Sequence, residues 1–152
     1  MIKKFTKNLE RGQAIILIAF AIIGMIAIVG LMTDGGILLI EYARLKRGID
    51  AASVAAAQQF RKGYVAADLA KAGEEFLRLN QSDVANVQID TCTTLPGDPV
   101  LCTDPPRKLV RITATRVVTF GFMRVVGFNS TTISASSVGE AASIDLVLAV
   151  DT

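Results

Sequence analysis

Residues 14–32 read AIILIAFAIIGMIAIVGLM, and none of these nineteen side chains is charged or forms hydrogen bonds. A helix needs about 20 apolar residues to cross the hydrocarbon core of a bilayer. A buried helix of a soluble protein normally shows a polar stripe, and a cleaved secretory signal has a shorter apolar run of about 7–15 residues. We therefore predict a transmembrane helix over 14–33.

The orientation of this span is predicted from its flanks, because cytoplasmic flanks carry an excess of Lys and Arg. The leader 1–13 contains one acid and four basic residues, which are Lys3, Lys4, Lys7 and Arg11. Three basic residues also follow within about fifteen positions after the span, so the bias is small. We expect the leader to lie in the cytoplasm, with its basic side chains at anionic headgroups.

The two cysteines, Cys92 and Cys102, enclose nine residues that include Pro96, Gly97 and Pro99. Turns formed at these residues would bring the two sulfur atoms together, which predicts a disulfide. Such a bond persists only in an oxidising compartment and would place the chain beyond the span outside the cytoplasm. The alternative is two free thiols.

Composition limits the chemistry. The 152 residues are 51% apolar and 20% charged with net charge +2, which fits one modest domain or two small units. The chain has no His and only two Cys, so histidine base catalysis, His-dependent triads and the common zinc ligand sets are excluded. Lys and Arg are mixed with Asp and Glu rather than gathered in a basic arm. We expect no enzymatic activity, no cofactor, no small-molecule substrate and no nucleic-acid partner.

The helical pattern continues beyond the membrane into a segment, 34–80, that we interpret as an extracytoplasmic helical stalk. An apolar stripe recurs at steps of three and four residues, at Leu38, Tyr42, Leu45, Ile49, Ala52, Ala56 and Phe60. One rod from about residue 13 to 62 would be roughly 75 Å long. The alternative is a kink at Gly35 and Gly36.

A second amphipathic helix is predicted over 65–79. We expect it to end near Asn80 and to bury one face, formed by Leu69, Ala72, Phe76 and Leu79.

The period then changes to that of strands. Segments 84–89, 109–120 and 131–137 alternate or are rich in β-branched residues, and they predict a small β module over 81–143. The expected class is α+β, with a small antiparallel sheet packed on the long helix, as in pilins. Between the last two strands lie five bulky apolar residues, Phe120, Phe122, Met123, Val125 and Phe128. We expect them to pack in the core, and the alternative is a partner surface.

Two stretches together resemble a known family. Residues 11–57 combine Arg-Gly-Gln, one membrane helix, Asp-Gly-Gly and an Asp-Ala-Ala helix, and residues 119–141 read TFGFMRVVGFNSTTISASSVGEA. Both are similar to the N-terminal region of TadG-like proteins of the Tad (tight-adherence) pilus-assembly system. The resemblance implies a single-pass membrane protein of pilus assembly or adhesion whose partners are the lipid bilayer, other pilus or assembly proteins and copies of itself.

The junction of Gly12 and Gln13 also resembles the processing point of type IV and archaeal-type pilins. Cleavage there would release residues 1–12 and leave an apolar helix that packs with its copies in a surface filament. Many such pilins have Glu at the fifth mature position, where this chain has Leu17. The alternative is that Gly12 and Gln13 merely begin a helix at the membrane surface.

The end of the chain, 144–152, is an apolar strand that ends in Asp151 and resembles the first strand of a von Willebrand factor type A domain. In that fold further oxygen ligands follow and bind a divalent cation. Asp151 alone is no metal site, so we predict none within these residues. An ordinary sheet strand is the alternative.

Overall fold

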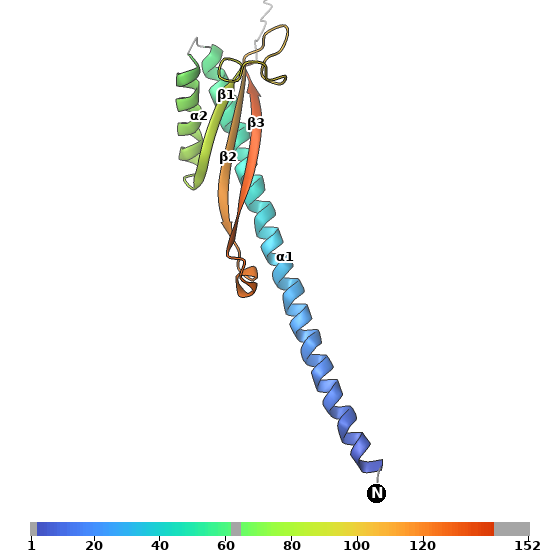
Figure 1. Ribbon diagram of the computed structural model, residues 1–152. Helices are drawn as coiled ribbons and strands as arrows, with labels where there is room; N and C mark the ends of the chain where they lie inside the picture. Colours follow the sequence, from blue (N-terminus) through green and yellow to red (C-terminus); the bar gives the residue numbers. More distant parts are fainter. Residues whose placement is uncertain (1–2, 62–64, 142–152) are drawn as a thin grey trace, which may run out of the picture. The chain divides into compact units, whose positions relative to one another are not determined.

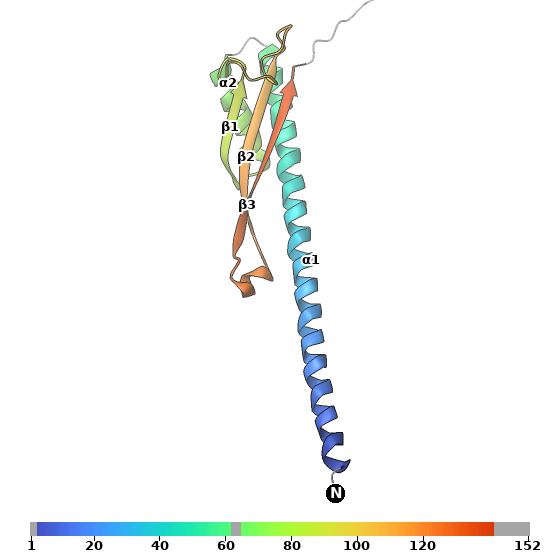
Figure 2. The same cartoon turned by 45° about the vertical axis from the view of Figure 1, so that its right-hand side comes forward.

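A computed structural model of the chain describes the backbone of residues 3–61 and 65–141, and the side chains of 13–61 and 65–141. In chain order its elements are α1 (Lys3–Arg61), α2 (Ala66–Asn80), β1 (Val84–Thr91), β2 (Leu109–Thr119), the 3-10 helix η1 (Met123–Val126) and β3 (Ser130–Glu140). The strands form one antiparallel sheet in the order β1-β2-β3 (Figures 1 and 2). The predicted α+β class is confirmed.

Helix α1 is longer than predicted. It begins at Lys3 rather than near Gln13, because the intervening KKFTKNLERG has no proline to end a helix. Its helical hydrogen bonding also continues through Gly35 and Gly36. The predicted strand at 144–152, with Asp151, lies outside the described residues.

Contacts divide the chain into two units. The first contains Met1–Ile40 and Thr119–Thr131, and the second contains Glu41–Val118 and Thr132–Thr152. The loop between β2 and β3 therefore belongs with the part of α1 up to Ile40. Most of the sheet belongs with α2 and with the part of α1 from Glu41 onward.

The core of the second unit lies between α1, α2 and one face of the sheet. Its fully buried members include Leu45, Ile49, Ala52, Ala56, Leu77, Val110, Ile112 and Ala114. The predicted stripe of α1 is thus confirmed from Leu45 to Ala56, whereas Tyr42 is exposed. In β2 the buried residues alternate with Arg111, Thr113 and Thr115, which leaves a polar outer face.

The buried face of α2 differs from the predicted one. Leu69, Gly73 and Leu77 are buried, whereas Phe76 and Leu79 are exposed. The helix turns Gly73 to the sheet, where an added Cβ would lie 2.9 Å from Cδ1 of Ile89. Close backbone approach, rather than side-chain size, therefore selects this face.

An irregularity bends the pairing of β1 with β2. The register shifts between Ala85 and Gln88, and Asn86 there has a φ of 48°. Its side-chain amide donates to Oγ1 of Thr115 at 3.1 Å. Asn tolerates this left-handed backbone better than most residues, so the bulge fits its sequence.

Strand β3 approaches α1 closely at Gly139, where an added Cβ would overlap the backbone carbon and oxygen of Ser53. We predict that Gly139→Ala destabilises the second unit by about 2 kcal/mol or more, because backbone atoms must move apart. Thermal unfolding followed by circular dichroism in detergent micelles would measure the change.

Gly36→Ala is the matched control, since nothing lies within 4 Å of an added Cβ there. It should leave stability unchanged or raise it by up to about 1 kcal/mol, because Ala favours helix over Gly. Equal unfolding midpoints for the two variants would contradict the close approach at Gly139.

Candidate functional site

The apolar part of α1 is long and apolar enough to cross a bilayer, and α1 is the only described helix that meets this test. Its large side chains between residues 15 and 32 are exposed in the isolated chain. From 13 to 40 the sequence contains one ionisable residue, Asp34, whose side chain is nevertheless buried, with a relative exposure of 1%. This surface therefore presents no charge to its surroundings over 28 residues, or about 42 Å of helix.

Asp34 is buried because it binds the loop between β2 and β3. Its carboxylate accepts backbone N–H bonds from Gly121 at 2.8 Å, Phe122 at 3.0 Å and Met123 at 2.7 Å. These donors precede or begin η1, so the carboxylate caps this short helix and satisfies amides that would otherwise lack partners. One charged side chain thus fastens the loop 121–128, the apolar loop, to α1.

Gly30 provides the second contact of the apolar loop. A Cβ added at Gly30 would lie 2.8 Å from Cβ of Phe122 and 2.9 Å from its Cγ. Only a glycine admits Phe122 so close to the helix backbone. Asp34 and Gly30 are one helical turn apart and therefore share a face.

The apolar loop does not pack in the core as predicted. Val125 and Val126 are 89% and 77% exposed, and Phe122 and Phe128 are also exposed. Phe120 and Met123 are half-buried. The reason is that the loop belongs to the first unit and contacts α1 at Gly30 and Asp34, whereas the core cluster belongs to the second unit. The alternative expectation, a partner surface, is the one that this exposure favours.

A half-open groove lies between the apolar loop and the span. Residues within 23–31 of α1 line one side, and residues within 122–128 line the other. Its volume is about 460 Å³, and its lining contains no charged side chain. Such a groove suits an apolar chain rather than a polar ligand.

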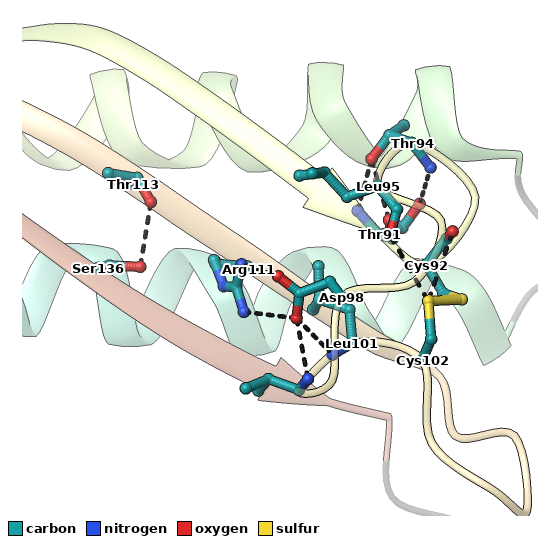
Figure 3. Close-up of polar contacts among 11 residues, drawn as sticks. Thr91, Cys92, Thr94, Leu95, Asp98, Leu101, Cys102, Arg111, Thr113 and Ser136 are labelled. Carbon is teal, nitrogen blue, oxygen red and sulfur yellow. Dashed lines mark hydrogen bonds and ion pairs between the residues drawn. A yellow bond between two sulfur atoms is a disulfide. The ribbon is translucent and has the colours of Figure 1, made fainter.

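The predicted disulfide between Cys92 and Cys102 is confirmed, with the two Cα atoms 5.0 Å apart. It closes the loop after β1 (Figure 3). Asp98 organises the interior of this loop by accepting N–H bonds from Val100 and Leu101 through Oδ1.

Arg111 of β2 ties this loop to the outer face of the sheet. Its guanidinium donates two hydrogen bonds to the carboxylate of Asp98, at 2.6 and 2.9 Å (Figure 3). These bonds lower the pKa of Asp98 to about 2, because the guanidinium stabilises the ionised carboxylate. The loop is therefore held both covalently and by a half-buried ion pair.

Charges reappear on α1 at Glu41. Arg116 of β2 pairs with Glu41 at 3.0 Å and also with Asp83. Glu41 is the first ionisable residue of α1 after the buried Asp34, so the uncharged surface ends there. Glu41 also begins the second unit.

For most of the other site residues predicted from the sequence, the structure describes the backbone but not the side chain. Gly12 and the basic residues of the leader lie in α1, but their side chains are outside the described residues. Gln13 is exposed. The sequence analysis missed the contact of Asp34 with the apolar loop. Two features could have indicated this contact: an acid at the end of an apolar run, and an apolar loop that no predicted helix covered.

Comparison with known protein families, with curated proteins and with solved structures finds no match to this chain.

We predict that Asp34→Asn and Gly30→Ala each release the apolar loop from α1. Asn offers one acceptor oxygen instead of two, and the Cβ of Ala displaces Phe122. Trypsin should then cut faster after Arg124, which is exposed in the loop. Mass spectrometry of timed digests in detergent micelles would measure the rate.

Gly24→Ala is the control, because an added Cβ there meets nothing within 4 Å. It should leave the cleavage rate as in the unchanged protein. If all three variants were cut at that same rate, the two contacts would not hold the loop.

We also predict that reduction of the disulfide loosens the loop between Cys92 and Cys102, since closure of a short loop contributes about 2 to 4 kcal/mol. Thermolysin, which cuts before apolar residues, should cleave faster near the exposed Val100 after reduction. A double Cys→Ser variant should be cleaved at the faster rate with or without reductant. Equal rates before and after reduction of the unchanged protein would argue against this role.

Proposed function

We propose that the protein is a non-enzymatic, single-pass membrane component of a Tad/Flp-type pilus assembly or adhesion system. The observation that carries the proposal is the combination, on one chain, of a basic leader, an apolar span and a disulfide-closed β module. The disulfide supports an extracytoplasmic module, and the leader supports a cytoplasmic N-terminus.

The resemblance of residues 11–57 and 119–141 to TadG-like proteins supplies the link to pili. Asp34, in the Asp-Gly-Gly part of the first stretch, holds Gly121, Phe122 and Met123 of the second. Parts of the two stretches that carry the resemblance, residues 11–40 and 119–131, therefore belong to one unit. These contacts support the interpretation of the two stretches as parts of one architecture rather than as separate coincidences of composition.

A second candidate is a pilin-like structural subunit that is cleaved after Gly12 and assembles into a filament. The uncharged surface of α1 favours it, because its length of about 42 Å exceeds the roughly 30 Å of a bilayer core. Neighbouring copies in a filament would cover the excess.

Intact mass measured separately in sheared surface filaments and in membranes tests the two candidates. We expect an uncleaved chain confined to membranes. A chain that begins at Gln13 and is recovered in filaments would reject the anchored component in favour of the structural subunit.

A further inference from the structure

The apolar loop leaves large side chains uncovered beside the span. Besides Val125 and Val126, the aromatic rings of Phe122 and Phe128 are exposed. Together with residues 23–31 of α1 they border the groove described above. A soluble protein rarely exposes such a contiguous patch, so its surroundings must be apolar.

The position of the groove along α1 identifies those surroundings. Arg11 and Glu41 bound the stretch 12–40, whose one ionisable residue, Asp34, is buried, and a crossing takes about 20 residues. Every window of that length within 12–40 contains residues 23–31. Whichever part of the stretch crosses the membrane, the groove then lies at the depth of the hydrocarbon.

From this we propose that the apolar loop is a second membrane-inserting element, which enters the extracytoplasmic leaflet beside the span and holds a lipid acyl chain in the groove. The inference rests on the proposed function only through the requirement that α1 crosses a bilayer. It adds a direct lipid-binding site to what the span alone would do.

The backbone of the apolar loop suits this environment. Hydrocarbon provides no hydrogen-bond partners, so inserted backbone groups must be satisfied within the protein. Asp34 satisfies the N–H groups of 121–123, and the N–H groups of Val125, Gly127 and Phe128 donate to carbonyls within the loop. The loop therefore inserts with most of its amides already paired.

Arg124 is the loop's one charged residue and is exposed. A long arginine side chain places its guanidinium at the phosphate layer while its apolar stem stays in the leaflet. Arg124 therefore limits the depth of the loop to the outer part of the bilayer.

The absence of Trp from the chain allows a direct depth measurement. Single variants Val126→Trp in the loop, Leu17→Trp in the span and Leu79→Trp on α2 replace side chains that are 77%, 70% and 80% exposed, so folding should be retained. Each full-length variant is reconstituted in phosphatidylcholine vesicles with or without bromine on the acyl chains. Bromine quenches only tryptophans that contact those chains.

We expect brominated lipid to quench Val126→Trp about as strongly as Leu17→Trp and to leave Leu79→Trp unchanged. Quenching of Leu17→Trp without that of Val126→Trp would overturn the inference while the span stands. If Leu17→Trp were not quenched, the span itself, and with it the proposed function, would fail. Quenching of Leu79→Trp as well would show that lipid contact is not specific to the loop, and would also overturn the inference.

A second copy of the chain is the competing occupant of the groove, and the same variant detects it. Val126→Trp would then be shielded from aqueous acrylamide but not quenched by brominated chains. This result would reject lipid as the occupant and assign the loop to contacts between subunits.

Discussion

The carboxylate of Asp34 is the contact on which the first unit depends. A charge directly after an apolar span would ordinarily mark the water boundary, because ionised groups are costly to place in hydrocarbon. Here three backbone amides surround it and leave it almost fully buried. The same bonds join segments almost 90 positions apart in sequence, so a single side chain both removes a charge from the helix surface and fixes the apolar loop.

A surface without charge from 13 to 40 then follows from the burial of one acid, and the next acid along α1 is paired as well. Asp34 is capped by the loop, and Glu41 is paired with Arg116 on β2. Thr33, directly before Asp34, donates its hydroxyl to the carbonyl of Val29 at 2.8 Å and adds no unsatisfied group. The chain therefore presents lipid, or a neighbouring helix, with an apolar surface that is longer than its apolar sequence.

Periodicity was sufficient to predict the fold class, the second helix and the strands, and an uninterrupted apolar run was sufficient to predict a helix long enough to cross a bilayer, because each of these features depends on neighbouring residues. The disulfide could also be predicted, since Pro96, Gly97 and Pro99 favour the turns that close its loop.

Three features could not be predicted, and all of them depend on contacts between distant segments. The buried face of α2 is set by the approach of Ile89 to Gly73, the place of the apolar loop by Asp34 and Gly30, and the fit of β3 by the backbone of Ser53 against Gly139. A pattern within one segment does not contain such contacts, and glycine carries no hydrophobic signal of its own.

The apolar loop also constrains how the chain can leave a membrane. In a bilayer its Phe122, Val125, Val126 and Phe128 side chains are covered by lipid, whereas in water their exposed apolar surface would lose about 25 cal/mol of stabilisation per Å². Extraction of the span alone would thus leave a second apolar surface to be covered. A filament that accepts this chain must cover the groove as well as the helix, so its subunit contacts would have to include residues near Phe122. An anchored component meets no such demand, because the leaflet that surrounds the span already covers the loop.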